Sequence, residues 1–186
     1  MKQAAHMILT LSLIGTLSGA VLALVNNWAA PLIAQRAREA KEAAIFMVQP
    51  GAVSYERAPL ENLEVYRVFD EAGAPLGYSM VTSSTGFQSE IKLMIGISAD
   101  LNTIIAIEIL DQKETPGLGT LITEPEFKDQ FSGLATLPNV AWVKGVAPDA
   151  PNEVQTITGA TISSRAVVEI VDKAVAQLRA VQEEMQ

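Results

Sequence analysis

The sequence predicts an α+β protein with one N-terminal transmembrane helix, followed by an antiparallel-rich sheet that is flanked by helices. Three patterns lead to this fold class. Residues 7–25 form an uncharged apolar run. Between about residues 65 and 110, short apolar runs alternate with turn residues, as neighbouring antiparallel strands do. Near the C-terminus the apolar residues instead recur at helical spacing, at positions 167, 171, 174, 175, 178 and 181.

The apolar run at residues 7–25 predicts a membrane anchor. As an α-helix, a run of this length spans about 28 Å, which is close to the hydrocarbon thickness of a bilayer. Trp28 follows where an interfacial aromatic residue is expected. A cleaved signal peptide is the alternative, but its apolar core is usually shorter, roughly 7–15 residues. We therefore expect residues 1–28 to be a retained anchor.

A helical linker is expected between the anchor and the soluble domain. Residues 29–50 are rich in strong helix formers, and they include Pro31, which the first turn of a helix tolerates. We expect a second helix over about residues 31–47, ended by Pro50 and Gly51. The linker then covers residues 29–50, and the soluble domain covers residues 51–186. Gly15 and Gly19 in the anchor have the spacing that lets another membrane helix approach closely.

Four strands are expected early in the soluble domain, at residues 65–69, 76–82, 91–98 and 103–110. The last of these strands is apolar on both faces apart from Glu108, which predicts a central, buried position in the sheet. A short helix is expected at residues 124–131, and a further strand at residues 139–144. The long C-terminal helix follows from about residue 162.

Composition limits the chemistry of the protein. There is no cysteine and only one histidine, His6. This excludes disulfides, thiolate metal sites, iron–sulfur clusters and c-type haem attachment, so electron transfer would need a borrowed cofactor. No metal site is expected. Residues 42–186 carry twenty acidic and nine basic side chains, which argues against a nucleic-acid partner and is most simply explained by solubility.

Three loops, at residues 83–89, 114–119 and 158–163, are candidates for a binding site. Clusters of Ser, Thr and Gly are usually ordinary turns, and Thr161 also suits the N-cap of the C-terminal helix. The third loop nevertheless has the features of a phosphate site. A helix N-terminus carries unpaired N–H groups and partial positive charge, Gly159 allows close approach of an anion, and Thr158, Thr161 and Ser163 add hydroxyls. It is neither a Walker A loop nor a dinucleotide fingerprint.

Two of these loops together resemble the FMN-binding domain family. Residues 158–163 read Thr-Gly-Ala-Thr-Ile-Ser, which is similar to the family's flavin-attachment motif: Ser or Asp, Gly, Ala, Thr or Ser, any residue, Ser or Thr. Thr158 is the one departure. Residues 114–119 read Glu-Thr-Pro-Gly-Leu-Gly and match the family's second motif in full. With its single anchor ahead of the β-rich domain, the chain most resembles the G subunit of Rnf electron-transport complexes.

The resemblance implies a flavoprotein subunit that carries electrons on FMN, bound covalently to Thr161 through a phosphodiester bond. A flavin transferase that uses FAD and a divalent metal would install the flavin. The protein would pass electrons inside a membrane complex that links ferredoxin and NAD to ion movement, and would not turn over a substrate alone. The cofactor-binding residues that the resemblance implies, besides Thr161, are Thr158, Gly159, Ala160, Ile162, Ser163, Glu114, Thr115, Gly117, Leu118, Gly86 and Phe87.

Two alternatives stay open. One is the C subunit of the sodium-translocating NADH:quinone reductase, a relative that usually carries extra sequence. The other is an anchored binding or scaffolding module without a cofactor. The indications for the side of the membrane on which the soluble domain lies are in conflict. The basic residues Arg36, Arg38 and Lys41 mildly favour a cytoplasmic domain. The resemblance implies instead that the domain lies on the extracytoplasmic side of the cytoplasmic membrane, and this is the side we expect.

Overall fold

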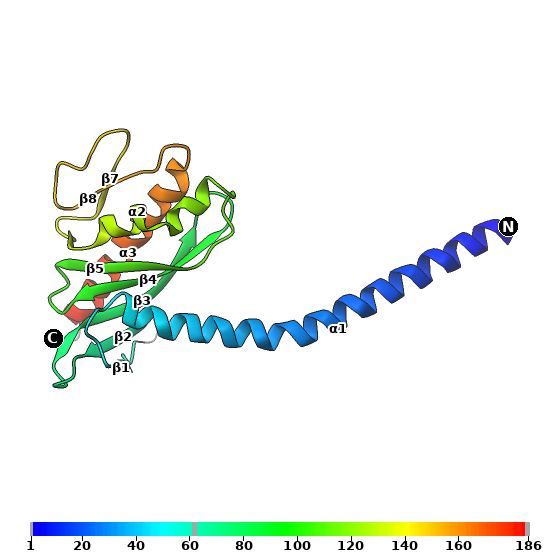
Figure 1. Cartoon of the computed structure of the whole chain (residues 1–186), viewed down its shortest axis with the longest axis horizontal. Coiled ribbons are helices and arrows are strands. Elements are labelled where there is room, and N and C mark those ends of the chain that lie inside the picture. Colours follow the sequence, from blue (N-terminus) through cyan, green and yellow to red (C-terminus); the bar gives the residue numbers. More distant parts are fainter. Residues whose placement is uncertain (1, 61–62, 185–186) are drawn as a thin grey trace. The chain divides into compact units, whose positions relative to one another are not determined.

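The computed structural model describes residues 2–60 and 63–184, and the chain divides into two compact units, Met1–Ala40 and Lys41–Gln186 (Figure 1). Helix α1 spans Lys2–Met47, and its part up to Ala40 makes up the first unit. Within the described part of the chain, α1 is the one helix that is long and apolar enough to cross a membrane. Hydroxyls in its apolar stretch bond to the helix's own backbone: Thr10 to the carbonyl of His6 and Thr16 to that of Ser12. These hydroxyls therefore need no partner in an apolar surrounding.

The expectation of a separate second helix beginning at Pro31 is wrong, because α1 runs without a break from Lys2 to Met47. Pro31 has no backbone N–H and so removes one intrahelical hydrogen bond. The residues around it are mostly strong helix formers, and their helical preference continues the helix across this gap. The helix does end at residue 47, where the sequence predicts it.

The second unit is built on an antiparallel sheet, as the sequence predicts, and this sheet has six strands. The strands lie in the sheet in the order β1-β2-β3-β4-β5-β6. Four of them match expected strands: β2 (Glu64–Phe69), β3 (Pro75–Thr85), β4 (Glu90–Ser98) and β5 (Thr103–Asp111). The short strands β1 (Ser54–Arg57) and β6 (Leu134–Ala135) were not expected; they lie at the two edges.

Strand β5 is not the central strand that its apolar sequence predicts. It lies next to the edge, where only Thr103 and Ile104 pair with β6. The deepest strand is β4, whose residues 93–97 are all buried. The sheet has a hydrophobic cluster on each face, and β5 contributes Ile104 to one cluster and Ala106 to the other. Its two apolar faces therefore reflect two covered sides of the sheet, not a central place in it.

Helix α3 (Thr161–Glu184) covers one face of the sheet, and the last turn of α1 covers the other. Ala44, Ile45 and Val48 are buried in the second cluster. The side chain of Gln49 donates two hydrogen bonds of 2.9 Å, to the carbonyls of Tyr78 and Ile97. Residues 41–50, which the sequence predicts as part of a linker, thus pack into the domain.

The chain between β5 and α3 builds one end of the domain. It forms the 3₁₀ turn η1 (Gly119–Thr123), the short helix α2 (Pro125–Lys128), the 3₁₀ turn η2 (Asp129–Phe131) and a parallel pair of strands, β7 (Ala141–Val143) and β8 (Glu153–Gln155). The expected helix at 124–131 is thus divided into α2 and η2, and the expected strand at 139–144 is shortened. These elements gather around the beginning of α3, shown in orange in Figure 1.

Candidate functional site

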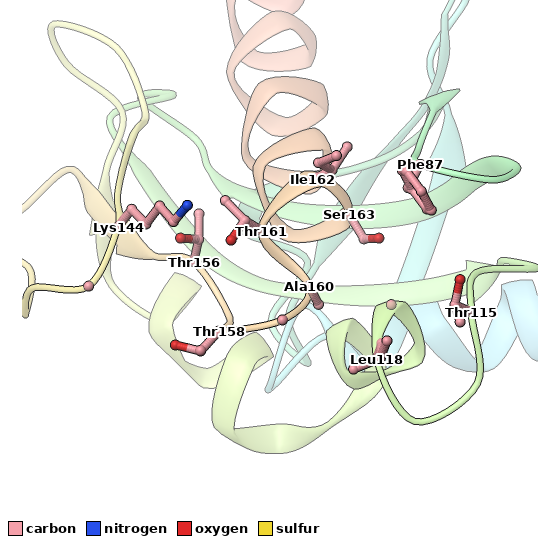
Figure 2. Close-up of a pocket in the computed structure, with 13 residues that line it drawn as sticks. Phe87, Thr115, Leu118, Lys144, Thr156, Thr158, Ala160, Thr161, Ile162 and Ser163 are labelled. Atoms are coloured by element: carbon pink, nitrogen blue, oxygen red, sulfur yellow. The ribbon is translucent and has the colours of Figure 1, made fainter.

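A cavity of about 710 Å³ lies at the beginning of α3 (Figure 2). This volume is within the range of roughly 300–1,000 Å³ that small-molecule sites occupy in proteins. All three candidate loops contribute to its wall, together with the chain after β7 and the residue after β8. The lining residues are Phe87, Thr115, Leu118, Gly119, Lys144, Gly145, Thr156, Thr158, Gly159, Ala160, Thr161, Ile162 and Ser163.

A tight turn leads into α3. The N–H of Ala160 donates to the carbonyl of Ile157 over 3.0 Å, with Thr158 and Gly159 at the centre of the turn. Gly159 has a φ of +86°, a value that the third residue of a type II turn requires and that residues with a Cβ rarely adopt. This turn places the residues that follow it at the cavity wall.

Thr161 is the first helical residue of α3. The N-cap interpretation of the sequence places Thr161 just before the helix, so the helix begins one residue earlier than that interpretation expects. The first turn of the helix closes with the N–H of Ser164 donating to the carbonyl of Ala160 over 3.0 Å. The amides of residues 161–163 precede this bond and have no intrahelical partner. No acidic residue lies in the first turn itself. The carboxylate of Glu114, however, accepts the hydroxyl of Ser163 in that turn at 2.6 Å, so it partly offsets the positive end of the helix dipole that faces the cavity.

The hydroxyls around the site differ in what they bond. Thr156 donates to the carbonyl of Val143 over 3.1 Å, and Ser164 donates to that of Ala160 over 2.8 Å. Ser163 donates to Glu114. Within residues 2–60 and 63–184, no such bond holds the hydroxyl of Thr161, which is partly buried and lies on the side of the cavity nearest Thr156 and Lys144 (Figure 2).

Glu114 is buried behind the wall, with 3% of its surface exposed. One carboxylate oxygen, Oε1, accepts the backbone N–H groups of Gln88 and Ser89 at 3.0 and 3.1 Å, and the other, Oε2, accepts the hydroxyl of Ser163 at 2.6 Å. Burial acts to raise the pKa of this carboxyl, but the hydrogen bonds from Ser163 and from the 87–89 backbone outweigh burial and lower the pKa. The ionised side chain therefore connects all three candidate loops.

Gly119 is packed against this carboxylate and its partner. A Cβ at position 119 would lie 2.7 Å from the Cβ of Glu114 and 2.9 Å from the Oγ of Ser163. Only glycine allows the backbone of η1 to come so close to both side chains.

The structure brings most of the predicted site residues to the cavity, and it leaves three of them out of the lining. Glu114 is buried behind the wall, Gly86 lies against Glu114, and Gly117 sits at a turn with a φ of +71°. All the other predicted residues line the cavity: Phe87, Thr115, Leu118, Thr158, Gly159, Ala160, Thr161, Ile162 and Ser163.

Lys144, Gly145 and Thr156 line the cavity although no sequence pattern singled them out. Thr156 holds the end of β7 in place, since its N–H donates to the carbonyl of Val143 over 2.8 Å. In Figure 2 the amino group of Lys144 is directed toward the side of the cavity where Thr156 and Thr161 lie. A single lysine after a short strand carries no local signal, so only the fold could reveal it.

Contacts to α3 hold the β7 segment beside the cavity. The backbone N–H of Val140 donates to Asp172 over 2.8 Å. The guanidinium of Arg165 lies 5.7 Å from the ring centre of Trp142, within the range of a cation–π contact. The segment that carries Lys144 is therefore attached to the same helix that carries Thr161.

Apolar side chains stand exposed at the other side of the cavity. Phe87 is 61% exposed, Leu118 is 48% exposed and Ile162 is 52% exposed, and all three line the cavity. Exposed apolar side chains grouped around a cavity are typical of a binding site. The arrangement can hold a ligand that has an anionic group at the helix start and a flat apolar group against these side chains.

Comparison with known proteins agrees with this geometry. The family model described as FMN-binding domain matches residues 86–176, a range that contains the cavity-lining residues. The crystal structure of Shewanella oneidensis NqrC has the same fold, with a TM-score of 0.57 at 21% identity over 72% of this chain and 74% of that one.

Two relatives are similar along most of their length. The G subunit of the ion-translocating oxidoreductase complex of Methanosarcina acetivorans is 33% identical over 184 residues, covering 94% of each chain. The G subunit of the Na(+)-translocating ferredoxin:NAD(+) oxidoreductase complex of Acetobacterium woodii is 33% identical over 86% of this chain and 84% of its own. By this similarity, the chain belongs to the family of the G subunits of Rnf-type ion-translocating oxidoreductase complexes.

Proposed function

We propose that this protein is the membrane-anchored flavoprotein subunit of an ion-translocating ferredoxin:NAD oxidoreductase complex. It carries electrons on FMN that is bound covalently to Thr161 by a phosphodiester bond. The observation that supports this most strongly is the position of Thr161. Its hydroxyl lies on the wall of a ligand-sized cavity, at the first residue of a long helix and inside the range that matches the FMN-binding domain.

The residues at the cavity fit a flavin phosphate. The unpaired amides at residues 161–163 and the helix dipole stabilise an anion, and the first turn itself contains no acidic residue. The nearby carboxylate of Glu114 lies behind the cavity wall, where it accepts the hydroxyl of Ser163. Lys144 adds positive charge on the same side. When bound, FMN supplies the electron-transfer chemistry, and the protein supplies its position and electrostatic environment. The exposed side chains of Phe87 and Leu118 offer apolar surface to the flavin ring.

In the proposed attachment reaction, the FMN group is transferred from FAD to the hydroxyl of Thr161. The Oγ of Thr161 attacks the phosphorus on the FMN side of the pyrophosphate, and the Oγ–P bond forms as the bond from that phosphorus to the bridging oxygen breaks. AMP leaves, and the hydroxyl proton passes to a base. A flavin transferase with a divalent metal supplies that base and neutralises the pyrophosphate charge. A covalent bond keeps the flavin in the protein through repeated electron transfers.

Helix α1 anchors the protein in the membrane, where it packs beside other subunits of the complex. The apolar length of α1 supports the anchor, and the spacing of Gly15 and Gly19 supports close helix contacts. We place the soluble domain on the extracytoplasmic side. Protease treatment tests this placement: the domain is digested in spheroplasts under this proposal, and digestion only in inverted membrane vesicles would contradict it.

Covalent attachment is tested by in-gel fluorescence after expression of the full chain together with a flavin transferase. The denatured wild-type band fluoresces if flavin is attached covalently. Thr161→Val removes the fluorescence, whereas the matched control Thr158→Val, three residues away on the same cavity wall, keeps it. Fluorescence that persists in Thr161→Val would place the attachment elsewhere. A dark wild-type band would instead favour an anchored scaffold without a cofactor.

The flavin-carrying component of a sodium-translocating quinone reductase is the remaining alternative within the flavin class. Similarity to a G subunit over nearly the full length of both chains favours the ferredoxin:NAD complex. Identification of the proteins that copurify with the tagged chain separates the two, since the two complexes have different partner subunits.

A further inference from the structure

Ser163 lies between the buried carboxylate of Glu114 and the cavity. Its Oγ is 2.6 Å from Oε2 of Glu114, and the residue also lines the cavity wall. Figure 2 shows its hydroxyl on the side of Phe87 and Thr115, away from the side where Thr161 and Lys144 lie. The direction of the hydrogen bond between Ser163 and Glu114 therefore decides what Ser163 can offer a ligand.

Ser163 must be the donor of this hydrogen bond, because its hydroxyl carries a hydrogen and the ionised carboxylate of Glu114 does not. An ionised carboxylate only accepts hydrogen bonds. Oε1 of Glu114 already accepts the N–H groups of Gln88 and Ser89. The hydroxyl of Ser163 is the side-chain donor to Oε2, and a hydroxyl has one hydrogen. Once that hydrogen is directed at Glu114, only the lone pairs of the Ser163 oxygen remain for the cavity.

We propose that Ser163 accepts a hydrogen bond from a donor group of the bound flavin, and that Glu114 is the positioning residue that fixes this polarity. The donor is either the ring N–H or a hydroxyl of the ribityl chain. This proposal rests on the proposed function only in taking FMN on Thr161 as the ligand. Ser163 is then not a second phosphate donor, the role that its hydroxyl suggests in the sequence.

The two sides of the cavity then have opposite hydrogen-bonding character. The helix amides and Lys144 offer hydrogens near Thr161, where a phosphate needs donors. Ser163 offers an acceptor on the other side, where Phe87 and Thr115 lie. A ligand with acceptors at its phosphate and a donor farther along fits in one direction only. The Glu114–Ser163 pair thus orients the flavin, whereas Thr161 tethers it.

A comparison of melting temperatures in the loaded and unloaded protein tests the contact of Ser163. Unloaded full-length protein comes from cells without the transferase, and loaded protein from cells with it. A purely structural residue lowers both melting temperatures equally, whereas a residue that contacts the flavin lowers the loaded one more. We expect Ser163→Ala to reduce the gain from loading by about 2–4 °C, the effect of one hydrogen bond in a chain of this size. Equal losses in both forms would overturn the proposal.

A conservative variant and a buried control sharpen this test. Ser163→Thr keeps the hydroxyl, so it restores the gain that Ser163→Ala loses. Ser79→Ala removes another buried hydroxyl, one that lies in the sheet and donates to the carbonyl of Ile45. It changes the loaded and unloaded melting temperatures by the same amount. Failure of Ser163→Thr to restore the gain would count against the hydrogen bond.

Glu114→Gln distinguishes the two kinds of donor. A glutamine can accept the two backbone N–H groups through its oxygen and donate its amide to Ser163, which turns the Ser163 hydroxyl toward the cavity. A ring N–H cannot accept that hydrogen, so the gain from loading falls as in Ser163→Ala. A ribityl hydroxyl can rotate and accept it, so the gain is kept. A reduced gain supports Glu114 as the residue that fixes the polarity, with a ring N–H as the donor. A gain that is kept, when Ser163→Ala reduces it, supports only the contact of Ser163 with a ribityl hydroxyl and counts against the role of Glu114.

The in-gel fluorescence of each loaded sample keeps this proposal separate from the proposed function. A dark wild-type band would end the assignment of covalent FMN, and no loaded form would exist. A fluorescent wild type with equal losses in Ser163→Ala would leave covalent FMN intact and reject the role of Ser163 and Glu114.

Discussion

The backbone of Gly86 lies directly against the carboxylate of Glu114. A Cβ at position 86 would be 2.6 Å from Oε1 of Glu114 and 2.6 Å from Cδ1 of Ile91. Neither neighbour is free to move away, since Glu114 is held by three hydrogen bonds and Ile91 is fully buried in the core. The conformation of the loop that carries Phe87 therefore requires glycine, which has no side chain, at position 86.

Gly86→Ala tests this contact. The added methyl group forces the 86–89 loop away from Glu114 or displaces Ile91, and such overpacking costs typically about 1–3 kcal/mol of unfolding free energy. We expect a corresponding loss of stability in chemical unfolding of the unloaded protein. Phe87→Ala serves as the control, because Phe87 is in the same loop and largely exposed. A Gly86→Ala variant as stable as wild type would show that the loop moves freely.

Acid is expected to remove the contribution of Glu114 to stability. The folded-state pKa of Glu114 lies below its ordinary value of 4.5. A lowered carboxyl pKa adds stability that is complete above the ordinary value and is lost as the pH falls through the folded-state value. Glu114→Gln cannot be protonated in this range. Its stability deficit relative to wild type, measured by urea unfolding, therefore shrinks as the pH falls below 4.5.

A deficit of Glu114→Gln that stays constant through the acid range would contradict this assignment. Glu108→Gln is the matched control. Glu108 forms its ion pair with Lys128, at 2.7 Å, and is more exposed than Glu114. Its substitution changes the stability only slightly, because partly exposed ion pairs contribute little.

Lys144 is expected to assist the attachment of flavin by its charge. Removal of one exposed cation beside a phosphate weakens the local attraction by an amount that salt screens. Lys144→Gln should therefore slow loading several-fold at low ionic strength and have less effect at high ionic strength, whereas Lys144→Arg keeps the charge. The measurement is the rate at which in-gel fluorescence appears after the transferase and FAD are added. Lys173→Gln, an exposed lysine on α3 outside the cavity, is the control.

Equal salt dependence of loading in wild type and Lys144→Gln would show that Lys144 takes no part. Because the side chain of Lys144 is exposed, its substitution should change the stability little. The unfolding free energy of Lys144→Gln should match that of wild type within about 0.5 kcal/mol.

The sequence predicted the sheet well because its strands are separated by clear turns. Asp70–Ala74 shows why: Asp70 accepts the N–H groups of Ala72 and Ala74, which closes the turn between β2 and β3. Two features misled the interpretation of the elements. The helical preference of the residues around Pro31 outweighed the missing hydrogen bond, and the apolar pattern of β5 reflects two covered faces of the sheet.

The site was predictable where residues close in sequence form a motif, and not where distant residues meet. Residues 158–163 and 114–119 stand together in the structure as the motifs indicate. The role of Glu114 behind the wall needed the fold, because its partners Ser163 and Gln88 are 49 and 26 residues away. Lys144 and Thr156 reach the cavity through the parallel pairing of β7 and β8, which no short sequence pattern encodes.

Mass spectrometry of the intact and digested protein tests the covalent flavin most directly. The full chain is expressed with the transferase, purified and denatured before measurement. We predict a mass increase equal to FMN less one water, and fragmentation that places this increase on Thr161. Its absence from the wild-type chain, or its placement on Thr158 or Ser163, would contradict attachment at Thr161.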